Sequence, residues 1–175
     1  DFQWGEHPWE IVAPSPEPTN EGWLLPKELT KQDVQELVQN FADAAKNAHA
    51  VRFEIAEIHG AHGYLVSQFL SGHHNRRTDQ WGGSLANRMR FPLEIFHAVR
   101  KVWPDDKPMS VRISANDWVE GEGIGPDDAV EIAGMLKEAG VDIIDVSAGQ
   151  TSKRAQPVYG RMFQTPFSDR IRNEA

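Results

Sequence analysis

The sequence predicts an α/β fold and, within that class, a partial (β/α)8 TIM barrel of about three strand–helix units. Helical segments alternate with short apolar strands, which favours a parallel sheet whose strands are joined by covering helices. Barrel active sites are built at the carboxyl ends of the strands, and a dinucleotide-binding doubly wound sheet needs a glycine fingerprint that this sequence lacks. The reactive side chains that stand late in a strand or just after one are His59, His62, Arg112, Ser114 and Ser147.

Residues 1–29 are predicted to be a loop-rich segment, because prolines and tryptophans occur there without a sustained hydrophobic period. A helix is predicted from Thr30, where apolar residues recur at helical spacing and Thr30 with Asp33 resembles a capping box. A strand is predicted over residues 53–58, running directly into His59.

The middle of the chain continues the alternation. Residues 84–103 are predicted to be helical, with a break at Pro92, because proline fits the first turn of a helix and disrupts its interior. A second strand is predicted over residues 110–114.

The remaining elements complete the pattern. Pro126 starts a well-signalled helix that Gly140 stops, and an apolar strand follows over residues 141–146. A last helix begins near Thr165. We therefore expect residues 30–175 to be the central part of a barrel, cut from a longer chain at both ends, since a complete barrel needs roughly 250 residues.

The composition is that of an ordinary globular domain, and it excludes several classes of protein. The net charge is −8, with 26 acidic against 18 basic residues, so a nucleic-acid or anionic-membrane surface has no electrostatic support. The chain has no cysteine, which removes disulfides, thiol nucleophiles and cysteine-ligated metals within it. Neither a membrane span nor a signal peptide is recognisable, and we expect a cytoplasmic location.

The candidate catalytic residues are two histidines and a tyrosine. His59 and His62 lie three residues apart beside glycines at the end of a strand, so two imidazole N–H groups can point at one spot. Such a pair can stabilise charge developing on a carbonyl oxygen, and Tyr64 offers a phenolic proton nearby. A metal site and a purely structural role for the histidines are the alternatives, although no acidic third ligand is evident and we expect no metal.

Five segments of the chain carry a family resemblance, namely residues 57–65, 75–79, 82–84, 110–114 and 145–149. Together they resemble the old yellow enzyme family of FMN-dependent ene-reductases, and the likeness covers nearly all of residues 30–175. The resemblance implies that His59 and His62 bind the oxygen of an activated alkene and that Tyr64 protonates its α-carbon. It also implies that Arg112 lies against the flavin ring, and that NADH or NADPH reduces the FMN.

Within this family, the chain most resembles the reductase-like module of flavin monooxygenases that act on aromatic acyl-CoA thioesters. The substrate implied is therefore a small enone or an aromatic acyl-CoA, and a homo-oligomer is compatible with the sequence. Two other functions stay open. One is a dienoyl-CoA reductase type of iron–sulfur flavoenzyme, and the other is an inactive barrel fragment that cannot bind flavin, because the family's phosphate-binding strands are not in this chain.

Three further expectations concern loops. The pair Val51-Arg52 replaces an Ala-Gly of the family, which removes a glycine suited to ending a helix. His73 and His74 replace part of a proline-containing loop, and we expect both to be exposed to solvent. A charged set is expected to form a structural ion-pair network that fixes the long loop: Arg76, Arg77, Asp79 and Arg88.

Overall fold

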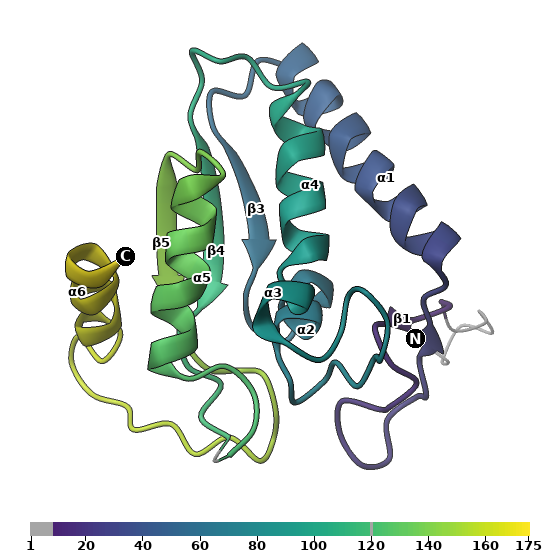
Figure 1. Cartoon of the computed structure of the whole chain (residues 1–175), viewed down its shortest axis with the longest axis vertical. Coiled ribbons are helices and arrows are strands. Elements are labelled where there is room, and N and C mark those ends of the chain that lie inside the picture. Colours follow the sequence, from purple (N-terminus) through teal and green to yellow (C-terminus); the bar gives the residue numbers. More distant parts are fainter. Residues whose placement is uncertain (1–8, 120) are drawn as a thin grey trace, which may run out of the picture.

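A computed structural model describes residues 9–119 and 121–175, so the first eight residues of the predicted loop-rich segment lie outside the described part. Helices and strands alternate along the chain after a short N-terminal pair of strands (Figure 1). The elements are β1 Val12–Ala13, β2 Lys27–Glu28, α1 Lys31–Ala50, β3 Ala56–Gly60, α2 Leu65–Leu70, α3 Leu85–Arg88, α4 Arg90–Arg100, β4 Met109–Ser114, α5 Pro126–Glu138, β5 Ile143–Ser147 and α6 Thr165–Glu174.

A parallel sheet of three strands, in the order β3-β4-β5, forms the centre of the structure. All three arrowheads point toward the lower edge of Figure 1, where α2, α3 and the long loops gather. Because side chains alternate across a strand, the sheet has an apolar face and a polar face. The register places Glu57 beside Ser110, and His59 beside Arg112 and Asp145, on the polar face.

The apolar face of the sheet carries the core. Ile58, Val111 and Ile113 are buried there, together with side chains of α4 and α5 such as Phe96 and Ile132. The helices therefore cover only one face of the sheet, and the polar face stays open beside His59, which is exposed. No helix within the described residues combines the length and hydropathy needed to cross a bilayer.

The predicted start of the first helix, α1, is confirmed. The Thr30 side chain accepts from the backbone of Asp33, and the Asp33 carboxylate accepts from the backbone of Thr30 at 2.9 Å, which is a complete capping box. At the other end Arg52 has φ +67°, so it takes the left-handed conformation that a glycine would adopt without strain. An arginine therefore occupies a left-handed position at the end of α1, where a glycine would be unstrained.

The predicted strand at residues 53–58 is wrong in its bounds. β3 runs from Ala56 to Gly60, so it starts three residues later and includes His59. Pairing with β4 begins where Met109 follows Pro108, because proline has no N–H to donate to a ladder. Phe53 stays outside the sheet with 58% of its surface exposed.

Most other predicted elements are confirmed, with shifted ends. Helices α3 and α4 divide the segment 84–103 at Met89, and Pro92 falls in the first turn of α4. The third strand was predicted over residues 141–146, but β5 covers Ile143–Ser147. Helix α2 was not predicted, because six residues are too short to show a helical period. Residues 9–29 were expected to be loop, yet β1 and β2 pair there as two-residue strands.

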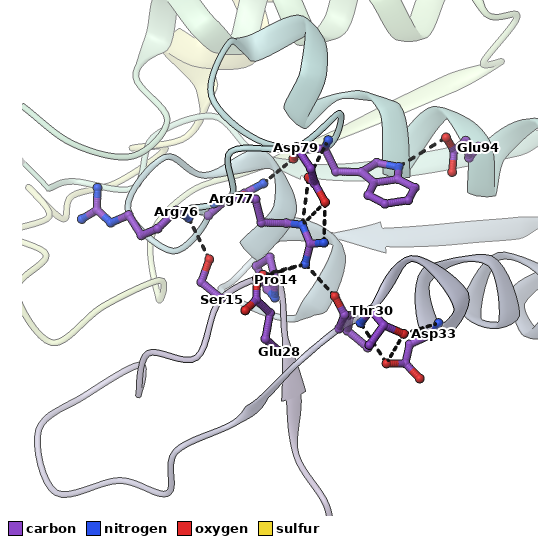
Figure 2. Close-up of polar contacts among 12 residues, drawn as sticks. Pro14, Ser15, Glu28, Thr30, Asp33, Arg76, Arg77, Asp79 and Glu94 are labelled. Atoms are coloured by element: carbon purple, nitrogen blue, oxygen red, sulfur yellow. Dashed lines mark hydrogen bonds and ion pairs between the residues drawn. The ribbon is translucent and has the colours of Figure 1, made fainter.

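Arg77 pins the long loop after α2 to the N-terminal segment (Figure 2). Its guanidinium forms two-pronged hydrogen bonds with Asp79, the closest at 2.6 Å, and donates to the carbonyls of Pro14 and Leu29 at 3.0 and 2.7 Å. The expected ion-pair network is thus present around Arg77. Arg88 differs, since its hydrogen bonds go to backbone carbonyls of Leu70 and Gly83 rather than to a carboxylate.

Candidate active site

The structure brings the three candidate catalytic rings together. The ring of His59 lies 5.3 Å from that of His62 and 5.3 Å from that of Tyr64, measured between centroids. His59 stands next to Arg112 in the strand register, so all four candidate residues share the carboxyl edge of β3 and β4. The clustering agrees with the predicted roles without testing them.

The turn after β3 aims His62 and Tyr64. His62 has φ +61° and Gly63 φ +73°, two successive left-handed residues that turn the chain sharply at the strand end. The N–H of His62 donates to Ser114 Oγ at 2.9 Å, which secures the strained residue to β4. A Cβ at Gly63 would lie 3.2 Å from Thr151 backbone atoms, so glycine is needed here for space as well as for conformation.

Helix α2 holds the same turn from its other side. The N–H of Gly63 donates to Ser67 Oγ at 3.3 Å, and Gln68 Nε2 donates to the Gly63 carbonyl at 2.9 Å. Both backbone polar groups of Gly63 are thus bonded to side chains of the first turns of α2. The loop carrying Tyr64 is therefore fixed by the helix that follows it.

A cavity of about 520 Å³ opens beside this turn. Tyr64 lines this cavity and is 64% exposed, so its side chain is accessible to a ligand. Lys153 lies over the ring of Trp23, with Nζ 5.4 Å from the ring centroid. The lining residues are Thr19, Asn20, Trp23, His62, Gly63, Tyr64, Gln68, Gln150, Thr151, Ser152 and Lys153.

Arg112 uses only part of its hydrogen-bonding capacity within the described residues. Nη1 donates to Asp145 Oδ2 at 2.8 Å, and Nη2 reaches Ser147 Oγ at 3.4 Å. Nε is buried and finds no partner among the described residues. Because a guanidinium has five N–H groups, Arg112 keeps donors and a positive charge for a ligand on the polar face.

The pKa of His62 is lowered from its ordinary 6.5, first by partial burial and then by the charges of Arg112 and His59, while Asp145 acts in the opposite direction. The imidazole of His62 is therefore neutral near pH 7. Its Nε2 lies 2.6 Å from Ser147 Oγ, a short contact between β3's turn and the end of β5.

The expectation that His73 and His74 are exposed is wrong. The His73 side chain is only 9% exposed, and its Nδ1 lies 2.7 Å from Glu122 Oε2. His74 Nε2 lies 3.1 Å from the Thr151 carbonyl, and burial lowers the pKa of His74. The two histidines fill the space between the loops after α2, β4 and β5, which a sequence reading of one loop could not show.

Ser147 was expected at a strand end but was given no role in the site, and Asp145 and Gln164 were not among the candidate residues. Asp145 pairs with Arg112, and Gln164 Nε2 donates to Ser147 Oγ at 3.1 Å. Aspartate in an otherwise apolar strand was the available signal for Asp145. Nothing in the sequence pointed to Gln164, because a loop of unknown path separates it from β5.

The comparisons with known proteins agree with this geometry. A family model described as the NADH:flavin oxidoreductase / NADH oxidase family matches residues 7–174. The chain belongs to this family. The resemblance to the old yellow enzymes is thereby confirmed, whereas the likeness to a monooxygenase-fused module stays a prediction.

Two curated relatives illustrate the match. An NADPH dehydrogenase of Geobacillus sp. (strain WCH70) is 49% identical over 166 residues, which are 95% of this chain and 48% of the relative. An NADH oxidase of Thermoanaerobacter brockii is 48% identical over 138 residues, 79% of this chain and 21% of the relative. The chain thus spans about half the length, or less, of these relatives.

Two solved structures show the same fold. The chain resembles 2-naphthoyl-CoA reductase in complex with 2-naphthoyl-CoA, with a TM-score of 0.85 and 29% identity over 94% of this chain and 26% of that one. It resembles morphinone reductase with a TM-score of 0.74 and 27% identity, covering 94% of this chain and 48% of that one. The predicted partial TIM barrel is confirmed by these neighbours and by the three parallel strands.

Proposed function

We propose that this chain is the central part of an FMN-dependent NAD(P)H oxidoreductase that reduces the activated C=C bond of α,β-unsaturated carbonyl compounds. The observation that carries the proposal is the group of His59, His62 and Tyr64 rings at the open polar face of the sheet, beside Arg112. In this proposal residues 9–29 are a loop-rich wall and residues 30–175 contribute three strands to the barrel.

The polar face of the sheet suits a flavin. It is not covered by the helices, and Arg112 is about one-third exposed there with donors to spare. A cation at this position favours an electron-rich, anionic ring. FMN, when bound, would supply the redox chemistry, taking up a hydride from NAD(P)H and returning it to the alkene.

The chain's own residues then act on the substrate. His59 and His62 donate hydrogen bonds to the substrate's carbonyl oxygen, and such donors are each worth about 10²–10³ in rate when they meet developing negative charge. Tyr64 lines the cavity and delivers a proton to the α-carbon. Within the described residues no group of three or more His, Asp or Glu side chains is arranged to hold a metal ion.

The first test is an FMN titration of the 175-residue chain beside a longer protein that supplies the remaining barrel strands. We expect the longer protein to bind FMN, with quenched flavin fluorescence. In that flavoprotein His59→Ala and His62→Ala should weaken binding of phenolic ligands and leave the flavin bound, whereas His97→Ala, an exposed histidine on α4, should change neither. Absence of FMN binding by both proteins would favour the inactive-barrel alternative.

A second candidate substrate is an aromatic acyl-CoA thioester. A further cavity of about 570 Å³ shares Thr19, Asn20, Ser152 and Lys153 with the catalytic cavity. Its walls also carry Arg76 and Arg154, which suit phosphate groups, although Glu122 already contacts both arginines. One solved neighbour is a complex of a reductase with 2-naphthoyl-CoA.

The two substrate classes can be separated by kinetics. If the substrate is a CoA thioester, KM should be lower for it than for the same acyl group on N-acetylcysteamine. Lys153→Ala together with Arg154→Ala should remove that difference. Equal KM values for both thioesters would leave the simple enone as the preferred class.

A further inference from the structure

Ser147 occupies a junction between three parts of the site. It ends β5, is only 2% exposed, and its Oγ has three polar neighbours. His62 Nε2 lies at 2.6 Å, Gln164 Nε2 at 3.1 Å and Arg112 Nη2 at 3.4 Å. The three neighbours come from the turn after β3, the residue that precedes α6, and β4.

The chemistry of these neighbours determines the direction of each hydrogen bond. A guanidinium nitrogen and an amide nitrogen can only donate, so Arg112 and Gln164 occupy the two lone pairs of the Ser147 hydroxyl. The single hydroxyl proton then remains for His62, and Nε2 must accept it. A neutral imidazole that accepts at Nε2 carries its proton at Nδ1.

We infer that Ser147 is a positioning residue that fixes His62 as the neutral Nδ1–H tautomer, so that Nδ1 is the nitrogen that donates to the substrate. The role of His62 toward the substrate rests on the proposed function, whereas the assignment of its tautomer rests only on the hydrogen bonds of Ser147. Arg112 and Gln164 act through Ser147, because they fix the direction of its hydroxyl proton.

The surroundings of His62 support the neutral form. Partial burial and the facing charges of Arg112 and His59 lower the pKa of His62, and Asp145 opposes them. The backbone is also fixed, since the N–H of His62 donates to Ser114 Oγ at 2.9 Å. With ring and backbone both held, the Nδ1–H direction is set before any ligand arrives, which is the condition for electrostatic preorganisation.

A fixed neutral donor has a consequence for proton transfer. Nδ1–H stabilises negative charge on the substrate oxygen and keeps its proton, so Tyr64 remains the proton source for carbon. If His62 were the other tautomer, Nε2–H would point at Ser147 and its lone pair would face the substrate oxygen. Two lone pairs would then repel, and the donor would be lost.

The test is a two-bond ¹H–¹⁵N NMR spectrum of the 175-residue chain labelled at histidine, with the His62 signals assigned from their loss in His62→Gln. We expect wild-type His62 to show the Nδ1–H pattern at pH 7.5. Ser147→Ala should convert it to Nε2–H or a mixture and raise its pKa, and Ser147→Thr should restore the wild-type pattern. Ser110→Ala, which removes a hydroxyl of the same sheet face bonded to Glu57, should leave His62 unchanged.

An Nε2–H pattern in the wild-type chain would overturn the inference, even if Ser147→Ala did not fold. An unchanged tautomer in folded Ser147→Ala would also overturn it. In the FMN-loaded protein we expect Ser147→Ala to lower kcat for alkene reduction by about tenfold to a thousandfold without changing flavin reduction by NAD(P)H. The lower end is one ordinary hydrogen bond and the upper end is one preorganised donor to developing charge. A correct tautomer in a protein that reduces no alkene would count against the proposed function alone.

Discussion

Arg77 and Arg112 both pair with an aspartate, yet the structure gives them different roles. Arg77 is 7% exposed in its side chain, and it donates to Asp79 and to two backbone carbonyls of the N-terminal segment (Figure 2). Arg112 is 34% exposed and makes one short hydrogen bond, to Asp145. A guanidinium whose donors are used by the protein stabilises the fold, whereas one with donors to spare can hold a ligand.

We expect the largest effect from Arg77→Ala. It leaves the carbonyls of Pro14 and Leu29 without their donor and separates the loop from the N-terminal segment, at a cost of about 3 kcal/mol in free energy of unfolding. Urea denaturation measures this, with the exposed Arg161→Ala as a control that should stay within about 0.5 kcal/mol. A loss below about 1 kcal/mol would show that Arg77 is not structural.

Arg112→Lys should have the opposite profile, with a loss of FMN affinity and little loss of stability. A lysine keeps the charge but loses the planar fork, so FMN affinity should fall about tenfold to a hundredfold, or about 1–3 kcal/mol. Stability without flavin should change by less than about 1 kcal/mol, because the pair with Asp145 is partly exposed. Flavin fluorescence gives the affinity. Unchanged FMN binding with a large loss of stability would make Arg112 a structural residue like Arg77.

A third arginine, Arg52, neither holds the fold together as Arg77 does nor offers donors to a ligand as Arg112 does. Arg52 is exposed, but its backbone is left-handed with φ +67°. Arg52→Gly should stabilise the chain by about 0.5–1 kcal/mol, since the relief of strain slightly exceeds the entropy of the unfolded glycine. Thermal unfolding measures the gain, and Arg52→Ala, which keeps the strain, should show none.

The smallest effect concerns pH. Since the folded pKa of His62 lies below its ordinary 6.5, the unfolded chain binds more protons there, and stability should fall as pH drops below about 6.5. Arg112→Gln removes one cause of the lowered pKa, so this fall should become shallower. The pKa of His74 is also lowered, mainly by burial, so His74 adds the same pH dependence to the wild-type chain and to Arg112→Gln. Urea unfolding between pH 8 and pH 5 measures it, and an unchanged slope would contradict the electrostatic coupling.

The sequence predicted elements whose signals are local. The capping box at Thr30, Pro92 in a first turn and Gly140 beyond a helix end each depend on a few neighbouring residues, and all three were found. The start of β3 was wrong, because Pro108 in another segment decides where its ladder can begin. The predicted exposure of His73 and His74 was wrong for a similar reason, since the His73 partner, Glu122, comes from another loop.

The sequence by itself determined the fold class and the set of candidate residues His59, His62, Tyr64 and Arg112. Period and strand-end position depend only on the order of residues along the chain. The tertiary structure alone decided which arginine is satisfied by the protein and which nitrogen of His62 carries the proton. Those outcomes depend on hydrogen-bond donors and acceptors up to 85 residues apart, as between His62 and Ser147, and only folding brings them within reach.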